Sequence, residues 1–183
     1  MTHANTYRII STFDGSTETC SLSKLSQNLK LNSILAELNS DGSLIDSWPL
    51  VHETLVTFTV EFADYALLNY AQKKLPEAKA CIALTRKWLE NHDSVSVEEL
   101  KSAAYAGHAA ARAAGAAAYA AYATDAAYYA ANAANAANAA NAAHAAAYAA
   151  GAAAYAAGGD ENSREAELIR QGQFIVEHLR AGT

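Results

Sequence analysis

Three segments in the first half of the chain carry apolar residues at three- and four-residue steps, the spacing that predicts amphipathic helices. The first expected helix spans Ser23–Leu38. The second expected helix begins at Pro49, since proline is favoured in the first turn of a helix. It continues through the β-branched run Thr54–Val60, which lowers the helix propensity but keeps the spacing of the apolar residues. The third spans Pro76–His92. The pattern therefore predicts helices over most of this half.

Two end signals organise the second half of the chain. Ser96 and Glu99 form a capping box, in which each side chain bonds the other residue's backbone N–H, so a helix is expected to start here. Gly158-Gly159 is a helix stop, after which a last helix is predicted over about Asn162–Leu179. The residues expected to face inward on this last helix are Ala166, Ile169, Gln173, Val176 and Leu179.

The first residues follow a different pattern. The segment Thr6–Thr19 contains residues that favour β-strands and the turn signal Asp14-Gly15. It is compatible with a short hairpin and with an irregular arm. No alternation of strands with helices follows, as a parallel sheet would need. The sequence therefore predicts an all-α fold, a single-domain helical bundle of about six helices with two central alanine-rich helices. Residues 1–22 would form the N-terminal arm or hairpin, and residues 23–183 the all-α domain.

Ala103–Ala157 consists mainly of alanine, the best helix former, and is helical by local preference. Its larger residues alternate steps of three and four in two runs, the spacing of a seam that faces a partner helix. The first run comprises Tyr105, His108, Arg112, Gly115, Tyr119 and Tyr122. The second comprises His144, Tyr148, Gly151, Tyr155 and Gly158. This segment is therefore expected to be the packed centre of the bundle.

Between the two runs the larger residues step strictly by three: Asn132, Asn135, Asn138, Asn141 and His144. Each such step falls about 60° short of a full turn, so the row winds around the helix instead of lining one face. We expect these asparagines to bridge to neighbouring helices. Thr124-Asp125 is the one capping signal inside the stretch, and it predicts two helices, about 97–123 and about 125–157.

The charge balance limits the partners. The net charge of −6 argues against a nucleic-acid partner and leaves room for a basic one. The alanine stretch lacks Leu, Ile, Val and Phe and is interrupted by polar residues, so it predicts no membrane-spanning helix and no membrane partner. No signal peptide is recognisable. Cys20 and Cys81 are isolated thiols, as expected of a reduced cytoplasmic protein.

No residue pattern predicts catalysis, a metal or a cofactor. Helical metal spacings such as HExxH do not occur, and no His lies near Cys81 in the sequence to activate it. His108 and Arg112 are one helical turn apart and could present a cationic patch that His144 joins. The alternative is a polar pair on a solvated helix edge. The tyrosines could form a binding surface or supply bulk between alanines. We therefore expect no enzyme.

The order of segments from Phe62 to Ala114 resembles the Imm-5-like family of bacterial immunity proteins. In that family a helix that ends near a proline leads to an R-x-W-L-like helix, followed by VEEL-like and HAAAR-like segments. The matching residues here are Arg86, Trp88, Leu89, Glu98, Glu99, Leu100, His108 and Arg112. The resemblance covers about the C-terminal two thirds of the chain. The asparagine row departs from it, and residues 1–45 carry no match.

This resemblance implies a non-catalytic protein that protects a bacterium by binding a cognate toxin of a polymorphic or contact-dependent system. The family's contact residues do not carry over one by one, and a homo-oligomer is left open. We expect the alanine helices to supply contacts through His108, Arg112, Tyr119, Tyr122, Asn138 and His144. Two alternatives differ in class. One is an alanine-rich helical ice-binding or structural protein, which the winding asparagine row disfavours. The other is an enzyme or small-ligand binder with a pocket in the bundle core lined by His108, His144 and carboxylates.

Overall fold

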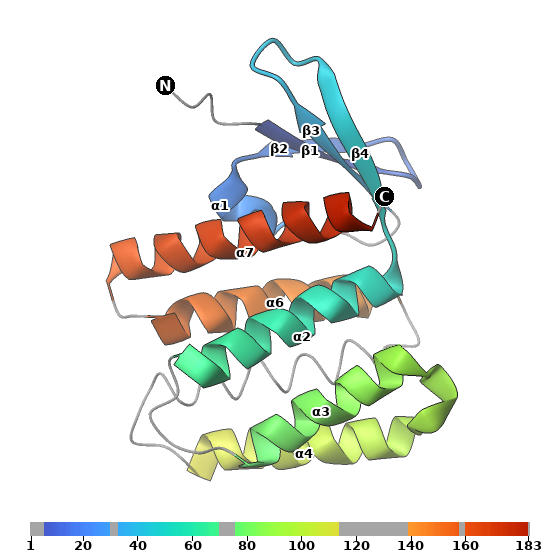
Figure 1. Cartoon of the computed structure of the whole chain (residues 1–183), viewed down its shortest axis with the longest axis vertical. Helices are drawn as coiled ribbons and strands as arrows, with labels where there is room; N and C mark the ends of the chain where they lie inside the picture. The colour runs from blue at the N-terminus through green and yellow to red at the C-terminus, as the bar shows by residue number, and fades with distance from the viewer. Residues whose placement is uncertain (1–5, 30–32, 70–75, 114–138, 158–159, 183) are drawn as a thin grey trace.

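A four-stranded antiparallel sheet forms one end of the molecule (Figure 1). The computed structural model describes residues 6–29, 33–69, 76–113, 139–157 and 160–182, with 107–113 and 139–147 described by their backbone. The strands follow the order β2-β1-β3-β4 and are β1 Thr6–Ser11, β2 Thr17–Cys20, β3 Ser33–Leu38 and β4 Leu44–Leu50. The fold is therefore mixed, and the prediction of an all-α bundle is wrong.

The position of β3 inside the sheet explains this error. β3 pairs with β1 on one side and with β4 on the other, which places Leu35 between Ile9 and Trp48. All of its side chains except Ile34 are buried, so the in–out alternation that marks a half-buried strand is missing. Its apolar residues, read together with those just before it, imitate helical spacing. Among the described residues of the predicted helix Ser23–Leu38, only those of the short α1, Leu22–Leu25, are helical.

Pro49 lies in β4 and does not open a helix, which corrects a second prediction. β4 is an edge strand, where a residue without a backbone N–H is tolerated. The helix itself, α2, spans His52–Asn69, so the helix expected across Thr54–Val60 is confirmed. Burial in the core, which Leu55, Val56 and Phe58 reach completely, outweighs the low helix propensity of the β-branched residues.

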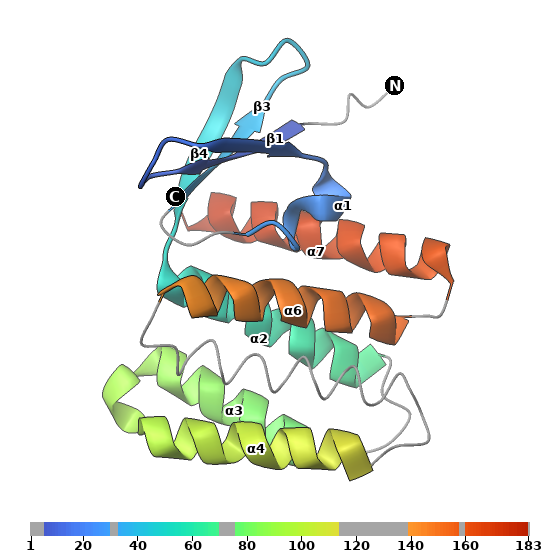
Figure 2. The ribbon, with the colours of Figure 1, turned by 180° about the vertical axis from the view of Figure 1, so that it is seen from behind.

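The helices lie in successive layers beneath the sheet (Figures 1 and 2). α7, Glu161–Ala181, lies next to the sheet with α1 packed against it; α2 and α6, Ala139–Ala157, form the next layer. α3, Pro76–Glu90, and α4, Val97–Ala113, form the last layer and are joined by a 3₁₀ turn at His92–Ser94. Within the described ranges, no helix has the length and apolar character to cross a membrane.

The helix start predicted at Ser96 is confirmed, and the inward face predicted for the last helix is confirmed only in part. Ser96 N donates to Glu99 Oε2 at 2.8 Å and Glu99 N donates to Ser96 Oγ at 3.2 Å, which completes the capping box. On α7, Val176 and Leu179 are buried as predicted. Its other buried positions are Glu167, Gln171, Gly172 and Ile175, whereas Ala166, Ile169 and Gln173 are exposed. The buried face is thus partly polar, which an apolar pattern could not find.

One ion pair connects the sheet to the end of α7. Arg180 Nη2 donates to Glu37 Oε2 at 2.6 Å, and the Glu37 side chain, on the face of β3 turned toward the helices, is fully buried. The two residues are 143 positions apart in the sequence. Such a buried carboxylate requires a partner, so the pair fixes how the sheet sits on α7.

Candidate partner-binding surface

α6 turns its alanines inward and its tyrosines outward. The buried residues of its described side chains are Ala149, Ala150, Ala153, Ala154 and Ala156. In contrast, 56% of Tyr148 and 48% of Tyr155 is exposed. The two tyrosines are seven residues apart and therefore lie on one side of the helix. The run that begins at His144 was predicted to face a partner helix, and this prediction is wrong for Tyr148 and Tyr155. The side of α6 that approaches α2 carries alanines instead, whose small methyl groups allow the close approach.

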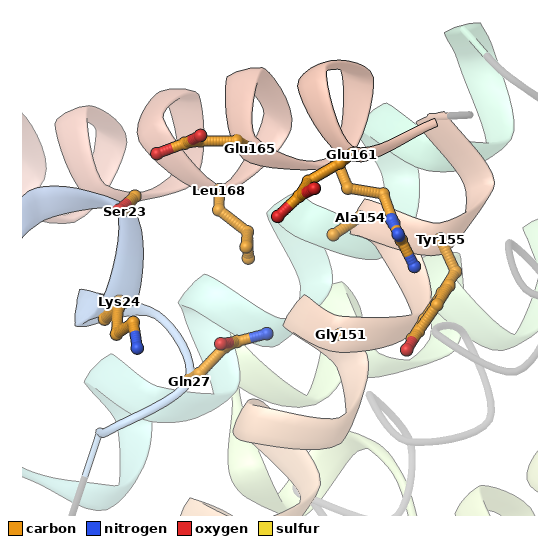
Figure 3. A pocket seen from close by; sticks show the side chains of 10 residues that line it. Ser23, Lys24, Gln27, Gly151, Ala154, Tyr155, Glu161, Glu165 and Leu168 are labelled. Atoms are coloured by element: carbon orange, nitrogen blue, oxygen red, sulfur yellow. The ribbon is translucent and has the colours of Figure 1, made fainter. Parts of the chain in front are cut away.

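A hollow of about 330 Å³ lies beside Tyr155, where α1, α6 and the start of α7 meet (Figure 3). Leu168 of α7 points into it and gives it an apolar side. The polar and aromatic residues around it are Ser23, Lys24, Gln27, Tyr155, Glu161, Arg164 and Glu165. We call the hollow together with the exposed faces of Tyr148 and Tyr155 the α1–α6–α7 surface.

Tyr155 and Arg164 connect α6 with α7 at the rim of the hollow. The guanidinium carbon of Arg164 lies 5.2 Å from the centroid of the Tyr155 ring, within the range of a cation–π contact. Tyrosine and arginine are the side chains that most often dominate the binding energy of protein interfaces, together with tryptophan. The rim therefore has the composition of a protein-binding surface.

The start of α7, which supplies the acidic side of the hollow, is fixed by Asp160. Ser163 Oγ donates to Asp160 Oδ2 at 2.7 Å, and Ser163 N donates to Asp160 Oδ1 at 2.8 Å. These hydrogen bonds, the side-chain one first, hold the pKa of Asp160 below its ordinary value of 3.8. The ionised carboxylate thus caps the helix and sets Glu161 and Glu165 in its first two turns beside the hollow.

The middle of α7 is held by a buried polar network. Arg170 donates from Nε and Nη2 to the two oxygens of Glu167 at 2.8 and 2.6 Å, and its guanidinium carbon lies 3.5 Å from the centroid of the Tyr65 ring on α2. Gln171 Nε2 donates to the backbone oxygen of Ala150 on α6 at 3.2 Å. These bonds connect α7 to both helices of the next layer, so they position the α7 side of the hollow.

α1 is set against α7 by close packing on Gly172. A Cβ atom on Gly172 would lie 2.3 Å from the backbone oxygen of Leu22, so only glycine allows this approach. Leu25 of α1 is fully buried in the core. Lys24 and Gln27, on the other side of this segment, are exposed and reach the hollow. The contact with α7 thus presents these two polar side chains.

The surface is equipped for binding by charge, amide and aromatic contacts. Across the described part of the chain, no cluster of three or more His, Cys, Asp and Glu side chains could hold a metal ion. Cys20 and Cys81 are buried and are not joined in a disulfide. Burial, followed by the charge of Glu18, raises the pKa of Cys20, which disfavours the reactive thiolate. Neither cysteine lines the hollow.

The residues predicted to contact a partner are only partly within the described structure. His108 and Arg112 belong to α4, and His144 belongs to α6. α4 packs against α3, whereas α6 packs against α2 and α7, so the two helices belong to different layers (Figure 2). Tyr119, Tyr122 and Asn138 lie outside the described residues, as do Thr124-Asp125, most of the asparagine row and Gly158-Gly159. The contact role of all six residues stays a prediction.

The charged residues around the hollow were missed at the sequence level. The helix predicted over Ser23–Leu38 rested on its apolar residues and did not single out Lys24 or Gln27. A usable signal did exist for α7: Asp160 and Ser163 stand in an N-capping arrangement directly before an acidic first turn, which places the helix start at Glu161. No sequence signal indicates that α1 returns to the start of α7.

A family model described as "Imm-5 like putative immunity protein" matches residues 48–175, more than half of the chain. The chain therefore belongs to the Imm-5-like immunity protein family, and the resemblance seen in the sequence is confirmed. No curated protein and no solved structure matches the chain.

Proposed function

We propose that this protein binds a cognate bacterial toxin and neutralises it by covering its surface, without catalysis. The observation that carries the proposal is the family match over residues 48–175. That segment contains α6 and most of α7, and hence Tyr148, Tyr155 and Arg164. An exposed tyrosine pair next to an arginine, on a rigid helical support, is well suited to anchor a protein partner.

We place the toxin contact on the α1–α6–α7 surface. The surface is held in shape by the cap at Asp160 and by the network of Glu167 and Arg170, so binding requires little ordering of the protein. The predicted residues of the alanine-rich helices form a second candidate surface: His108, Arg112, Tyr119, Tyr122, Asn138 and His144. Substitutions on the α1–α6–α7 surface and on the alanine-rich helices should therefore differ in their effect on toxin affinity.

Co-expression with the toxin encoded by the neighbouring gene tests the function. The toxin alone should arrest growth of a bacterial host, and the full chain should restore it. The purified proteins should also form a complex in size-exclusion chromatography. Absence of both protection and complex would reject the proposal. A thermal-hysteresis measurement on the same preparation tests the ice-binding alternative.

Tyrosine variants locate the contact. Removing the rings in Tyr148→Ala and Tyr155→Ala together should weaken the complex by about 30-fold or more, since an interface anchor contributes about 2 kcal/mol or more. Tyr105→Ala is the matched control, because Tyr105 is 69% exposed but lies on α4. Isothermal titration calorimetry measures both. If the Tyr105 variant is the one that loses affinity, the contact lies on α4 near His108 and Arg112.

A further inference from the structure

One part of the wall of the hollow lies inside the segment that matches the immunity family, and another part lies outside it. Tyr155, Glu161, Glu165 and Leu168 belong to α6 and α7 and lie inside residues 48–175, the segment that matches the immunity family. The α1 wall precedes that segment, as do β1, β2, β3 and most of β4. The part of the chain outside the family match therefore completes a surface that the matched part begins.

Some side chains of the α1 wall pack against the rest of the protein, and others are exposed beside the hollow. Leu22 lies against Gly172 and Leu25 is fully buried, so the apolar residues fix the wall in place. Lys24 and Gln27 are exposed beside the hollow. A shorter side chain at either position would leave the packing of Leu22 and Leu25 unchanged. Their position on a fixed wall is what would make them selective toward a ligand in the hollow.

The two walls carry opposite net charges, because the α1 wall has Lys24 and the α7 wall has Glu161 and Glu165 beside the single cation Arg164. Lys24 lies on the α1 side, and Glu161 and Glu165 project from α7 on the other side (Figure 3). Within the described residues, none of these three side chains is held in an ion pair, in contrast to Glu167, which Arg170 neutralises. Charges arranged in this way set the orientation of a ligand as well as its affinity.

We propose that α1 is the specificity-determining wall of the toxin site. The occupant is a loop of the toxin that presents an acidic side chain to Lys24 and a basic side chain to Glu161 and Glu165, with its apolar part against Leu168. A basic group on the toxin also fits the net charge of −6 of this chain. The proposal rests on the toxin-binding function proposed above.

Charge reversal at Lys24 tests the proposal. The probe is the purified toxin encoded by the neighbouring gene, and the full-length chain is titrated with it at low and at physiological salt. Lys24→Glu makes both walls acidic and should weaken binding by about 10-fold, with a smaller salt dependence than the wild type. Lys24→Arg keeps the charge and should keep most of the affinity. Lys79→Glu, the same reversal at an exposed lysine on α3, is the matched control and should bind like the wild type.

The outcomes separate this proposal from the proposed function. If the wild type does not bind the toxin, both fail. If Tyr155→Ala weakens binding and Lys24→Glu does not, the toxin uses the surface but α1 does not select it. Equal losses for Lys24→Glu and Lys79→Glu indicate a general charge effect and also overturn the role of α1. Unchanged melting temperatures of the Lys24 variants exclude misfolding as the cause.

Discussion

α6 and α7 are neighbours that share the same hollow, yet they are held in the fold by different kinds of contact. α6 is held by shape: among its described side chains, from Tyr148 to Ala157, the buried ones are alanines, whose methyl groups fit closely against α2. α7 is held by polar bonds, with a capped start at Asp160, the buried Glu167 near its middle and Arg180 bonded to the sheet at its end.

The difference teaches how the two helices obtain their positions. Alanine contacts are short but not directional, so they allow α6 to lie close to α2 without fixing its rotation strongly. Hydrogen bonds and ion pairs have defined geometry, and α7 makes two that reach other elements: Gln171 donates to the backbone oxygen of Ala150 on α6, and Arg180 donates to Glu37 on β3. α7 is therefore the helix that fixes the geometry of the hollow, and α6 supplies a close-packed support carrying tyrosines.

Arg170→Ala should have the largest effect, because it removes the charged partner of Glu167, whose side chain is 1% exposed, and leaves that carboxylate the neutral donor Gln171 Nε2 at 3.0 Å. We expect a loss of about 3 kcal/mol in the free energy of unfolding, at the lower end for a broken buried pair because Arg170 is itself partly exposed. Arg164→Ala, on the same helix, removes a cation–π contact at the rim and should cost below about 1 kcal/mol. Urea unfolding measures both. Equal losses would contradict the view that α7 depends on this pair.

Ala153→Leu should have the next largest effect, because Ala153 is fully buried in the core that α6 shares with α2. The three added carbons have no space there, and overpacking of this kind costs about 2–3 kcal/mol. Ala80→Leu makes the same change at an exposed position of α3 and should alter stability by about 0.5 kcal/mol or less. Thermal unfolding followed by circular dichroism compares the two. A tolerated Ala153→Leu would show that α6 is not held by close contact.

The sequence predicts the helical half of the fold well because its signals are local. The capping box at Ser96 and Glu99 and the proline at the start of α3 act within a few residues. Arg86, one of the residues behind the family resemblance, is structural: it donates to Glu61 and Asp64 at 2.9 and 2.8 Å and thereby connects α3 to α2. The resemblance could therefore identify the family without locating its binding surface.

The sheet and the hollow depend on contacts between distant residues, and these are not visible in local spacing. Glu37 interrupts an otherwise apolar strand, and only its pairing with Arg180 makes its burial understandable. The display of Lys24 depends on the glycine at position 172, far away in the chain. Heptad-like spacing of Tyr148 and Tyr155 correctly places them on one side of α6, but spacing alone does not tell which side is buried.

Two glycine-to-alanine substitutions, one on α7 and one on α6, should have the smallest effects. They should change the free energy of unfolding in opposite directions. In Gly172→Ala the new Cβ would lie 2.3 Å from the backbone oxygen of Leu22, so α1 has to move away from α7. We expect a loss of about 1–2 kcal/mol together with weaker toxin binding, because the wall that carries Lys24 is displaced. In Gly151→Ala the new Cβ meets nothing within 4 Å, so the higher helix propensity of alanine should stabilise α6 by about 0.5–1 kcal/mol. Chemical unfolding of both variants gives the signs; stabilisation by Gly172→Ala would mean that α1 does not depend on close contact with α7.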